Sequence, residues 1–199
     1  MSFTETNINI FRMINDLGKE YTYLNPPFVF IAEYTVYLLA LATIVYWFTR
    51  EYKNRMMVIS AGITFIFAEI IGKLAGTLHS NYQPFVELDN VNKLIEKTVG
   101  NSFPSDHTIL FFSFCMAFWL FKKGYGFLWI IAAILVGISR MWVGVHYPAD
   151  VAAGALISIV SAIIAYYVVP KLSFIQKLLR LYEKGEGYIL PSKSNSKDF

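Results

Sequence analysis

Two short segments of this sequence carry side chains that can transfer a phosphoryl group. The first runs from Phe103 to His107 and reads Phe-Pro-Ser-Asp-His, and the second contains Arg140, His146 and Asp150. An imidazole can attack phosphorus or protonate a leaving group, a carboxylate can orient the imidazole, and a guanidinium binds phosphate oxygens. The chain has three histidines, and two of them lie in these segments. The combination indicates a phosphatase site that works through side chains.

The first segment has the features of a helix start. Ser102 followed by Pro104 is typical of a cap and a first turn, which places His107 in the first turn of the next helix. The backbone N–H groups near Ser105, Asp106 and His107 would point out of that helix end, in front of the positive end of the helix dipole, and could bind phosphate. Helix capping alone explains the same residues, so this segment leaves both interpretations open.

The second segment places an arginine close to a histidine and a carboxylate. Arg140 stands near the end of an apolar run, where an unpaired arginine costs several kcal/mol, so it needs an anion. Pro148 argues against one continuous helix, and Asp150 is predicted to cap the helix that starts at Val151. Its carboxylate can then hold one nitrogen of His146 and leave the other free to attack. The alternative is an ordinary buried ion pair between Arg140 and Asp150, with His146 in a loop.

The composition indicates an integral membrane protein of one domain. The 199 residues are 56% hydrophobic and 17% aromatic, with a mean hydropathy of +0.48, and only 16% are charged, against roughly 25% in a soluble domain. The net charge of +3 is small and the basic residues are scattered, which argues against a nucleic-acid partner. The single cysteine, Cys115, lies in an apolar run, cannot form an internal disulfide and is predicted to be a packing residue.

Apolar runs predict an all-α bundle that crosses the membrane about five times. A spanning helix needs about 20 mostly apolar residues. Five runs approach this length, at residues 28–48, 56–74, 104–122, 125–143 and 151–169. These runs define a membrane domain over residues 28–170, followed by a basic tail over residues 171–199. The end of the tail, beyond about Tyr188, has no apolar pattern and is predicted to be disordered.

The first 27 residues are predicted to lie at the membrane surface. Between Asn7 and Tyr23, apolar and charged residues alternate at helical spacing, which is typical of an amphipathic helix in the interface plane. If this helix crosses the membrane instead, the bundle has six spans. The segment is too polar to be a cleavable signal peptide.

The basic residues of the short loops predict the orientation. They gather in three groups after the first, third and fifth runs: Arg50, Lys53, Arg55; Lys122, Lys123; and Lys171, Lys177, Arg180, Lys184. Such groups favour the cytoplasm. Both phosphate-type segments border the opposite connections, so the site is expected on the extracytoplasmic side.

Together the two segments resemble the type-2 phosphatidic acid phosphatase superfamily of membrane lipid phosphatases. The pattern Ser105-x-His107, then Ser139-Arg140-x5-His146-x3-Asp150, is similar to the second and third motifs of that superfamily. The superfamily usually has Pro-Ser-Gly-His in the second motif, and here Asp106 replaces the glycine. Within the superfamily, the chain resembles the bacterial undecaprenyl pyrophosphate phosphatases of the bacitracin-resistance type. The resemblance implies an all-α polytopic membrane bundle with a vanadium haloperoxidase-like fold.

The resemblance also implies a reaction. It is the hydrolysis of undecaprenyl pyrophosphate to undecaprenyl phosphate and inorganic phosphate through a phosphohistidine, without a metal or another cofactor, at the plasma membrane of a bacterium. His146 would be the nucleophile, Asp150 would orient it, and His107 would protonate the departing lipid phosphate. The substrate-binding residues would come from the set Arg140, Ser105, Asp106, Gln83, Lys73 and Ser139. Recycling of this cell-wall lipid carrier is expected to give bacitracin resistance.

Two other functions stay open at this point. One is another lipid phosphatase of the superfamily, acting on phosphatidylglycerophosphate, diacylglycerol pyrophosphate or phosphatidic acid. The other is a non-catalytic lipid-phosphate binder or transporter. The sequence does not reveal the oligomeric state.

The sequence departs from the superfamily at the first motif. The usual pattern is Lys-x6-Arg-Pro, whereas here Gln83 precedes Pro84, and Lys73 lies ten residues before Gln83. Glutamine can donate to phosphate but has no charge to contribute. Lys73 can replace the missing cation or pair with Glu69, four residues earlier on the same helix face.

Three further titratable residues, His79, Lys93 and Glu33, lie outside the motifs. His79 and Lys93, in the polar stretch before Phe103, are more simply explained as solvated side chains. Glu33, near the outward end of the first run, either relays protons at the site or packs in the bundle in its protonated form.

Overall fold

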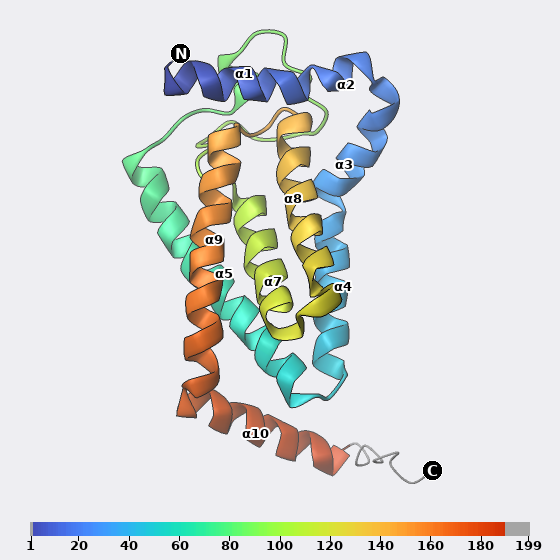
Figure 1. Cartoon of the computed structure of the whole chain (residues 1–199), viewed down its shortest axis with the longest axis vertical. Coiled ribbons are helices and arrows are strands. Elements are labelled where there is room, and N and C mark those ends of the chain that lie inside the picture. The colour runs from blue at the N-terminus through green and yellow to red at the C-terminus, as the bar shows by residue number, and fades with distance from the viewer. Residues whose placement is uncertain (1, 190–199) are drawn as a thin grey trace.

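The computed structural model describes residues 2–189, which fold into helices and connecting loops without a β-strand in that range (Figure 1). The α-helices are α1 (Phe3–Asn15), α2 (Leu17–Glu20), α3 (Asn25–Glu33), α4 (Thr35–Phe48), α5 (Tyr52–Leu78), α6 (Pro84–Glu87), α7 (Asp106–Lys122), α8 (Phe127–Trp142), α9 (Pro148–Val168) and α10 (Ser173–Ile189). Short 3-10 turns lie at Thr22–Leu24, Gly124–Gly126 and Val169–Lys171.

The apolar runs of the sequence form the helices of the bundle, and the run at residues 28–48 forms two of them, α3 and α4. Within the described residues, three helices are long and apolar enough to cross a membrane, at Tyr52–Leu78, Gly124–Trp142 and Pro148–Lys171. The segments Thr22–Glu33 and Thr35–Phe48 pass the same test together, with a bend of 43° between them. The remaining run is α7, whose 17 residues lie in the middle of the bundle. The predicted all-α membrane bundle is therefore confirmed, with three or four helices of full spanning length.

Helix α7 forms the centre of the apolar core and contacts α5, α8 and α9. Its buried side chains include Phe111, Cys115 and Phe118, and Cys115 is fully buried among apolar neighbours, as predicted. Helix α9 approaches α7 closely because residue 154 is glycine: a Cβ there would lie 3.0 Å from the carbonyl oxygen of Ser105. This close approach brings the beginning of α9 beside the beginning of α7.

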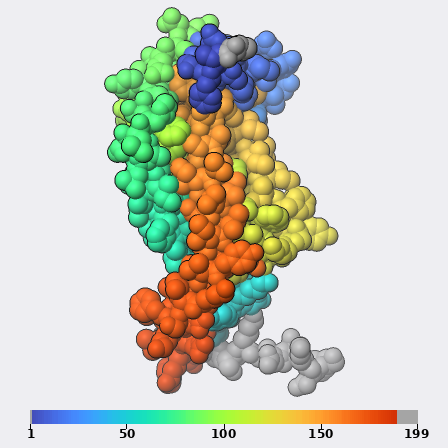
Figure 2. All heavy atoms as spheres, turned by 60° about the vertical axis from the view of Figure 1, so that its left-hand side comes forward, coloured from blue at the N-terminus to red at the C-terminus, as the bar shows by residue number. Residues whose placement is uncertain are grey.

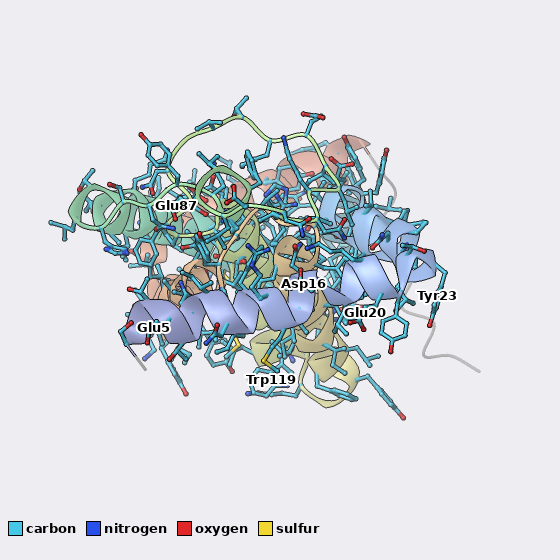
Figure 3. The ribbon with its side chains drawn as sticks, turned by 90° about the horizontal axis from the view of Figure 1, so that it is seen from above. Glu5, Asp16, Glu20, Tyr23, Glu87 and Trp119 are labelled. Atoms are coloured by element: carbon cyan, nitrogen blue, oxygen red, sulfur yellow. The ribbon has the colours of Figure 1, made fainter. Side chains whose placement is uncertain are left out.

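The chain reverses direction at two ends of the bundle, and the two phosphate-type segments lie at the same end. The connection from α5 to α7 and the turn from α8 to α9 both lie next to α1, which runs across the bundle instead of along it (Figures 1 and 3). Figure 2 shows α9 between α5 and α8, with α1 over its upper end. The serine before α1 starts this helix with a capping box, because Ser2 and Glu5 each bind the other's backbone N–H.

Helix α10 crosses the other end of the bundle, where the basic loops lie (Figure 1). The guanidinium of Arg55, which is 1% exposed, binds the carboxylate of Glu186 at 2.7 Å and lies over the rings of Trp47 and Tyr182. These contacts fasten α10 to the start of α5. The segment predicted to be disordered lies mostly at residues 190–199, outside the described residues.

Candidate active site

His146 lies in the turn between α8 and α9 and is 3% exposed. Gly144 makes this turn possible, because its φ of +83° is strained for other residues and a Cβ there would lie 2.8 Å from the carbonyl oxygen of Asn92. Nδ1 of His146 lies 3.0 Å from the carbonyl oxygen of Ser102. A carbonyl oxygen only accepts hydrogen bonds, so Nδ1 carries the proton and Nε2 keeps its lone pair.

Asp150 anchors the same side of the imidazole. Its Oδ2 accepts hydrogen bonds from the hydroxyl of Ser102 at 2.6 Å and from the backbone N–H of Tyr147 at 2.8 Å, and lies 3.6 Å from Nδ1 of His146. Asn81 approaches the other carboxylate oxygen at 3.5 Å. The carboxylate is buried and well partnered, so it holds one orientation beside His146.

Asp150 was expected to cap a helix that starts at Val151, and this prediction was wrong by three residues. Helix α9 begins at Pro148, because proline fits the first helical position, where no backbone N–H is needed. Asp150 is therefore the third residue of the helix, and it binds the N–H of the capping residue, Tyr147. The predicted break between Arg140 and Asp150 is confirmed, since α8 ends at Trp142.

Ser102 is a member of the site that the sequence did not reveal. It was expected to cap the helix carrying His107, but α7 begins at Asp106 with Ser105 as its cap residue. Ser102 is instead fully buried between His146 and Asp150, with its hydroxyl 3.1 Å from Nδ1 of the histidine. The sequence Ser102-Phe103-Pro104 at the edge of an apolar run does not distinguish a helix cap from a residue of the site.

His107 lies in the first turn of α7, as predicted, and faces the same site as His146. Its imidazole is in electrostatic contact with Arg140 most strongly, and then with Lys97 and His146. The beginning of α7 therefore presents a second imidazole to the first. The two segments singled out from the sequence, 30 or more residues apart, converge at one end of the bundle.

Arg140, on the last turn of α8, is 2% exposed and has open hydrogen-bonding capacity. Its Nη1 donates to the carbonyl oxygen of Ala32 at 2.9 Å, while its Nε has no partner in the described part of the chain. Glu33 is in electrostatic contact with it. The alternative of a buried ion pair between Arg140 and Asp150 was wrong, because Asp150 binds Ser102 and Tyr147 instead.

The serines of the two motifs are bound within the protein. Ser105 donates its backbone N–H to the carbonyl oxygen of Asp150 at 3.1 Å and accepts a hydrogen bond from Thr108 at its hydroxyl. Ser139 donates its hydroxyl to the carbonyl oxygen of Val136 within α8. Asp106 is exposed at the start of α7. The outward N–H groups at this helix start are therefore those after Ser105.

Gln83 and Lys73 occupy different surroundings. Gln83 is 1% exposed, and both ends of its amide bind the loop before α7: Nε2 donates to Thr98 and Oε1 accepts from the N–H of Gly100. Lys73 is exposed on α5. Glu69 is in electrostatic contact with both Asp106 and Lys73. Among the described residues, however, Glu69 and Lys73 do not form an ion pair within 4 Å.

The sequence matches a known family over most of this bundle. Residues 57–174, more than half of the chain, match the profile described as "PAP2 superfamily". The chain belongs to the PAP2 superfamily. The fold expected from the motif resemblance is thus the fold of the family that the chain belongs to.

Named relatives and one solved structure extend this result. The protein is 61% identical over 198 residues to the "Bacitracin transport permease protein BcrC" of Bacillus licheniformis, covering 100% of this chain and 98% of the relative. It is 32% identical over 178 residues to the "Undecaprenyl-diphosphatase BcrC" of Bacillus subtilis, covering 89% and 92%. The crystal structure of Aquifex aeolicus LpxE is similar, with a TM-score of 0.61 and 25% identity, over 80% of this chain and 94% of that one.

In this PAP2 protein, helix α1 covers the Asp150 side of the site. Asn15 donates to the carbonyl oxygens of Met141 and Trp142, at 3.3 and 2.8 Å, and so holds the end of α8. The ring of Phe11 packs edge-on against Tyr147, with 5.5 Å between centroids. The N-terminal helix therefore supports the turn that carries the nucleophile candidate.

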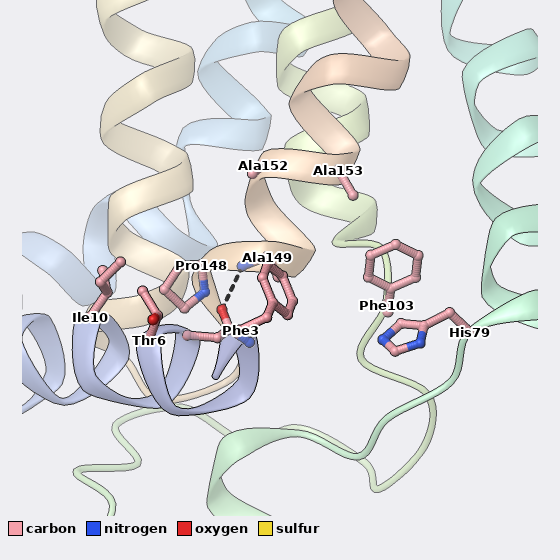
Figure 4. A pocket seen from close by; sticks show the side chains of 10 residues that line it. Phe3, Thr6, Ile10, His79, Phe103, Pro148, Ala149, Ala152 and Ala153 are labelled. Atoms are coloured by element: carbon pink, nitrogen blue, oxygen red, sulfur yellow. Dashed lines mark hydrogen bonds between the residues drawn. The ribbon is translucent and has the colours of Figure 1, made fainter. Parts of the chain in front are cut away.

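An apolar pocket of about 500 Å³ separates the beginning of α1 from the end of α5 (Figure 4). Phe3 and Ile10 line it from α1, and the start of α9 closes it, where Asn7 accepts a hydrogen bond from the N–H of Ala149 at 2.9 Å. His79 lies on the opposite wall, with its ring edge-on to Phe103. The third histidine is thus part of this pocket.

Burial sets the proton affinity of the loop residues at the site. Burial lowers the pKa of His146, the carboxylate of Asp150 (3.6 Å from Nδ1) opposes this effect, and the charge of Arg140 lowers the pKa further. Nε2 is therefore unprotonated near neutral pH. Burial raises the pKa of Tyr147, and its hydrogen bond to Glu87 raises it again. Among residues 2–189, no group of three or more His, Cys, Asp or Glu side chains is placed to hold a metal ion.

Proposed function

We propose that this protein hydrolyses undecaprenyl pyrophosphate to undecaprenyl phosphate and inorganic phosphate. One observation carries the proposal: Nε2 of His146 is buried, unprotonated and without a hydrogen-bond partner among the described residues, in electrostatic contact with Arg140. A buried polar atom without a partner costs about 1–3 kcal/mol, so its place in this turn is best explained by a ligand that binds there. The name of the Bacillus subtilis relative agrees with this reaction.

The first chemical step transfers the terminal phosphoryl group to His146. Nε2 attacks the terminal phosphorus, and the anhydride bond to the lipid phosphate breaks. His107 gives its proton to the departing oxygen. Asp150 and Ser102 hold the imidazole and stabilise the positive charge that develops on it. Arg140 and the N–H groups at the start of α7 stabilise the charge on the phosphoryl oxygens.

The second step releases inorganic phosphate. Water attacks the phosphohistidine, His107 accepts a proton from that water, and the bond between phosphorus and Nε2 breaks. Both histidines then return to their starting protonation states. The site residues provide the nucleophile, the acid and base, and the electrostatic stabilisation that this reaction needs, without a metal ion or cofactor as a participant.

An apolar groove supports a long isoprenoid substrate. It has a volume of about 300 Å³ and is lined by Val36, Leu39, Ala40, Thr43, Ile44, Leu110 and Phe114. Leu110 and Phe114 lie three and seven residues after His107 on α7, so they share its helix face. The groove thus borders the face of α7 that carries His107, which suits a lipid chain that extends from the phosphate site.

The proposed location is the plasma membrane of a bacterium, with the site on the extracytoplasmic side. Residues 28–170 form the catalytic membrane domain. The basic groups lie at the α10 end, which favours the cytoplasm for that end and for the tail. Helix α1 exposes apolar side chains, including Phe3 at 76% and Met13 at 72%, which suits a segment up to residue 27 that rests in the membrane interface. Recycling of the lipid carrier there is expected to give bacitracin resistance.

Transport is a second candidate, because the Bacillus licheniformis relative is named as a bacitracin transport permease. A transporter would bind its ligand without releasing phosphate. A different lipid phosphatase activity would release phosphate from another substrate. Both alternatives give results that the following experiment separates from the proposed function.

The test measures phosphate release by purified protein from undecaprenyl pyrophosphate in EDTA. We expect turnover that vanadate inhibits, and a loss of about 10⁴-fold or more in His146→Ala, because the nucleophile is removed. Phosphatidylglycerophosphate, diacylglycerol pyrophosphate and phosphatidic acid serve as competing substrates. Turnover by His146→Ala would overturn the assignment of the nucleophile, and a wild-type protein that binds the lipid without releasing phosphate would favour transport.

A further inference from the structure

The loop before α7 carries a lysine, Lys97, that the motif analysis did not single out. Lys97 is half-buried, whereas its neighbours Glu96 and Thr98 are exposed. Among residues 2–189, no carboxylate lies within 4 Å of its ammonium. A lysine that loses part of its hydration without gaining an ion pair needs a reason, because burial of an ammonium group is costly.

The backbone before Lys97 is fixed to the end of α8. Leu94 donates its N–H to the carbonyl oxygen of Val143 at 3.2 Å, three residues before His146. Ile95 is buried and packs with Trp142 and Val143 in a small apolar cluster. The loop is therefore attached to the same turn that carries the proposed nucleophile.

The backbone after Lys97 is fixed by Gln83. The buried amide of Gln83 binds Thr98 at 3.2 Å and Gly100 at 3.1 Å, so both of its polar atoms hold this stretch of loop. Two residues further on, Ser102 donates its N–H to the carbonyl oxygen of Asn81 at 2.7 Å. Lys97 thus lies between two attached stretches of the loop, at Leu94 on one side and at Thr98 and Gly100 on the other.

The charged groups that act on Lys97 belong to α7, α8 and the His146 turn, and the loop of Lys97 is attached to the end of α8. Lys97 is in electrostatic contact with Arg140 and Asp106, and both His107 and His146 respond to its charge. Burial lowers the pKa of Lys97, Arg140 lowers it further, and Asp106 opposes them. Lys97 and Arg140 are two cations in electrostatic contact, and Nε of Arg140 has no hydrogen-bond partner among the described residues, so an anion at this position would balance both charges and accept that open hydrogen bond.

Charge balance requires more than one cation at this position. A phosphoryl group carries about −1.5 to −2 charges at neutral pH, and both motif carboxylates add negative charge nearby. Arg140 supplies a single positive charge. Lys73 is exposed on α5 and is in electrostatic contact with Glu69. Lys97, by contrast, is half-buried and in electrostatic contact with both histidines.

We propose that Lys97 is a substrate-binding residue whose ammonium, held by the Gln83-anchored loop, binds the pyrophosphate group together with Arg140. Gln83 is then a positioning residue: it acts through the loop and does not contact the phosphate. The proposal rests on the proposed phosphatase function and names a further residue of the same site.

The test compares Lys97→Gln and Lys97→Arg with wild-type protein on undecaprenyl pyrophosphate. We expect Lys97→Gln to raise KM about 10- to 100-fold, the range for loss of one charged hydrogen bond, with kcat changed less than about threefold. Lys97→Arg keeps the charge and should recover most of the affinity. Inorganic pyrophosphate, used as a competitive inhibitor, should show the same order of affinities.

Lys93→Gln is the matched control, because Lys93 lies in the same loop but pairs with Glu96 at 3.5 Å and covers the ring of Phe85. It should keep the wild-type KM. If Lys97→Gln has the wild-type KM and the wild-type inhibition by pyrophosphate, the proposal is wrong although the phosphatase function stands. If both Lys97 variants lose activity equally while their thermal stability falls, the role of Lys97 is structural and the proposal is also wrong. An inactive wild-type protein would overturn the proposed function itself.

Discussion

The two nitrogens of His146 lie in opposite surroundings. Nδ1 lies within 3.1 Å of two oxygens of Ser102, beside a carboxylate that is itself held by two short hydrogen bonds. Nε2 has no partner within the described residues, and neither has the nearby Nε of Arg140. One side of the ring is finished by the protein, and the other side is left for a ligand. This difference shows that the hydrogen bonds within the protein orient the imidazole through Nδ1, whereas the reactive atom, Nε2, stays free.

The two sides also come from different parts of the chain. The Nδ1 side is built from the residue 81 region, the loop before α7 and the start of α9, with α1 supporting it from outside. The Nε2 side is formed by the last turn of α8, the first turn of α7 and the loop around Lys97. Variants on the first side should change kcat through the orientation of His146, whereas Lys97 variants should change KM.

Asp150→Asn should have the largest effect among variants of the Nδ1 side. The asparagine amide has the shape of the carboxylate but can be oriented in two ways. In one of them its NH₂ group lies opposite the Ser102 hydroxyl and the Tyr147 N–H, which are themselves donors to the carboxylate. The loss of charge also removes stabilisation of the imidazolium. We expect kcat to fall about 10³-fold or more, comparable to the loss of a triad carboxylate. Steady-state kinetics with undecaprenyl pyrophosphate measures this effect.

The pH profile of Asp150→Asn sharpens the same test. The pKa of His146 is lowered, so the acid limb of kcat/KM in the wild-type protein should lie below pH 6.5, the ordinary value for histidine. Because the carboxylate of Asp150 raises that pKa, its replacement by a neutral amide should move the limb to still lower pH. A limb that moves to higher pH would contradict the role given to Asp150.

Ser102→Ala should have an intermediate effect. The variant loses the 2.6 Å hydrogen bond to Asp150 but keeps the backbone oxygen that accepts from Nδ1. A hydrogen bond to a charged group contributes about 1.5–3 kcal/mol, so kcat should fall about 10- to 100-fold. Ser158→Ala is the control, since it removes a buried hydroxyl that binds Ile109 within the bundle, away from the imidazole. Equal losses in both variants would indicate a general effect on stability.

Much of this fold could be predicted from the sequence, because the length of an apolar run and the charge of a loop are both properties of neighbouring residues. The motifs placed His107 in the first turn of its helix and His146 in a turn, and they brought both to one end of the bundle. Ser102 and Lys97 could not be assigned in this way. Their roles depend on contacts between loops up to 48 residues apart, as in the hydrogen bond from Ser102 to Asp150, and single-residue patterns carry no information on such contacts. The position of Gln83 in the first motif predicted a phosphate ligand, whereas in the structure its buried amide binds Thr98 and Gly100.

Tyr147→Phe should have the smallest effect. It removes the hydrogen bond from the phenol to Glu87 at 2.9 Å but keeps the ring against Phe11 and the backbone N–H that binds Asp150. Because the lost bond joins the phenol to Glu87 and not to the imidazole, we expect kcat to fall no more than about fivefold and thermal stability to fall by about 1 kcal/mol. Tyr125→Phe, on an exposed residue at the opposite end, controls for the chemical change. A loss as large as that of Asp150→Asn would show that the phenol acts in catalysis and that the division between a positioned and a reactive side of His146 is incomplete.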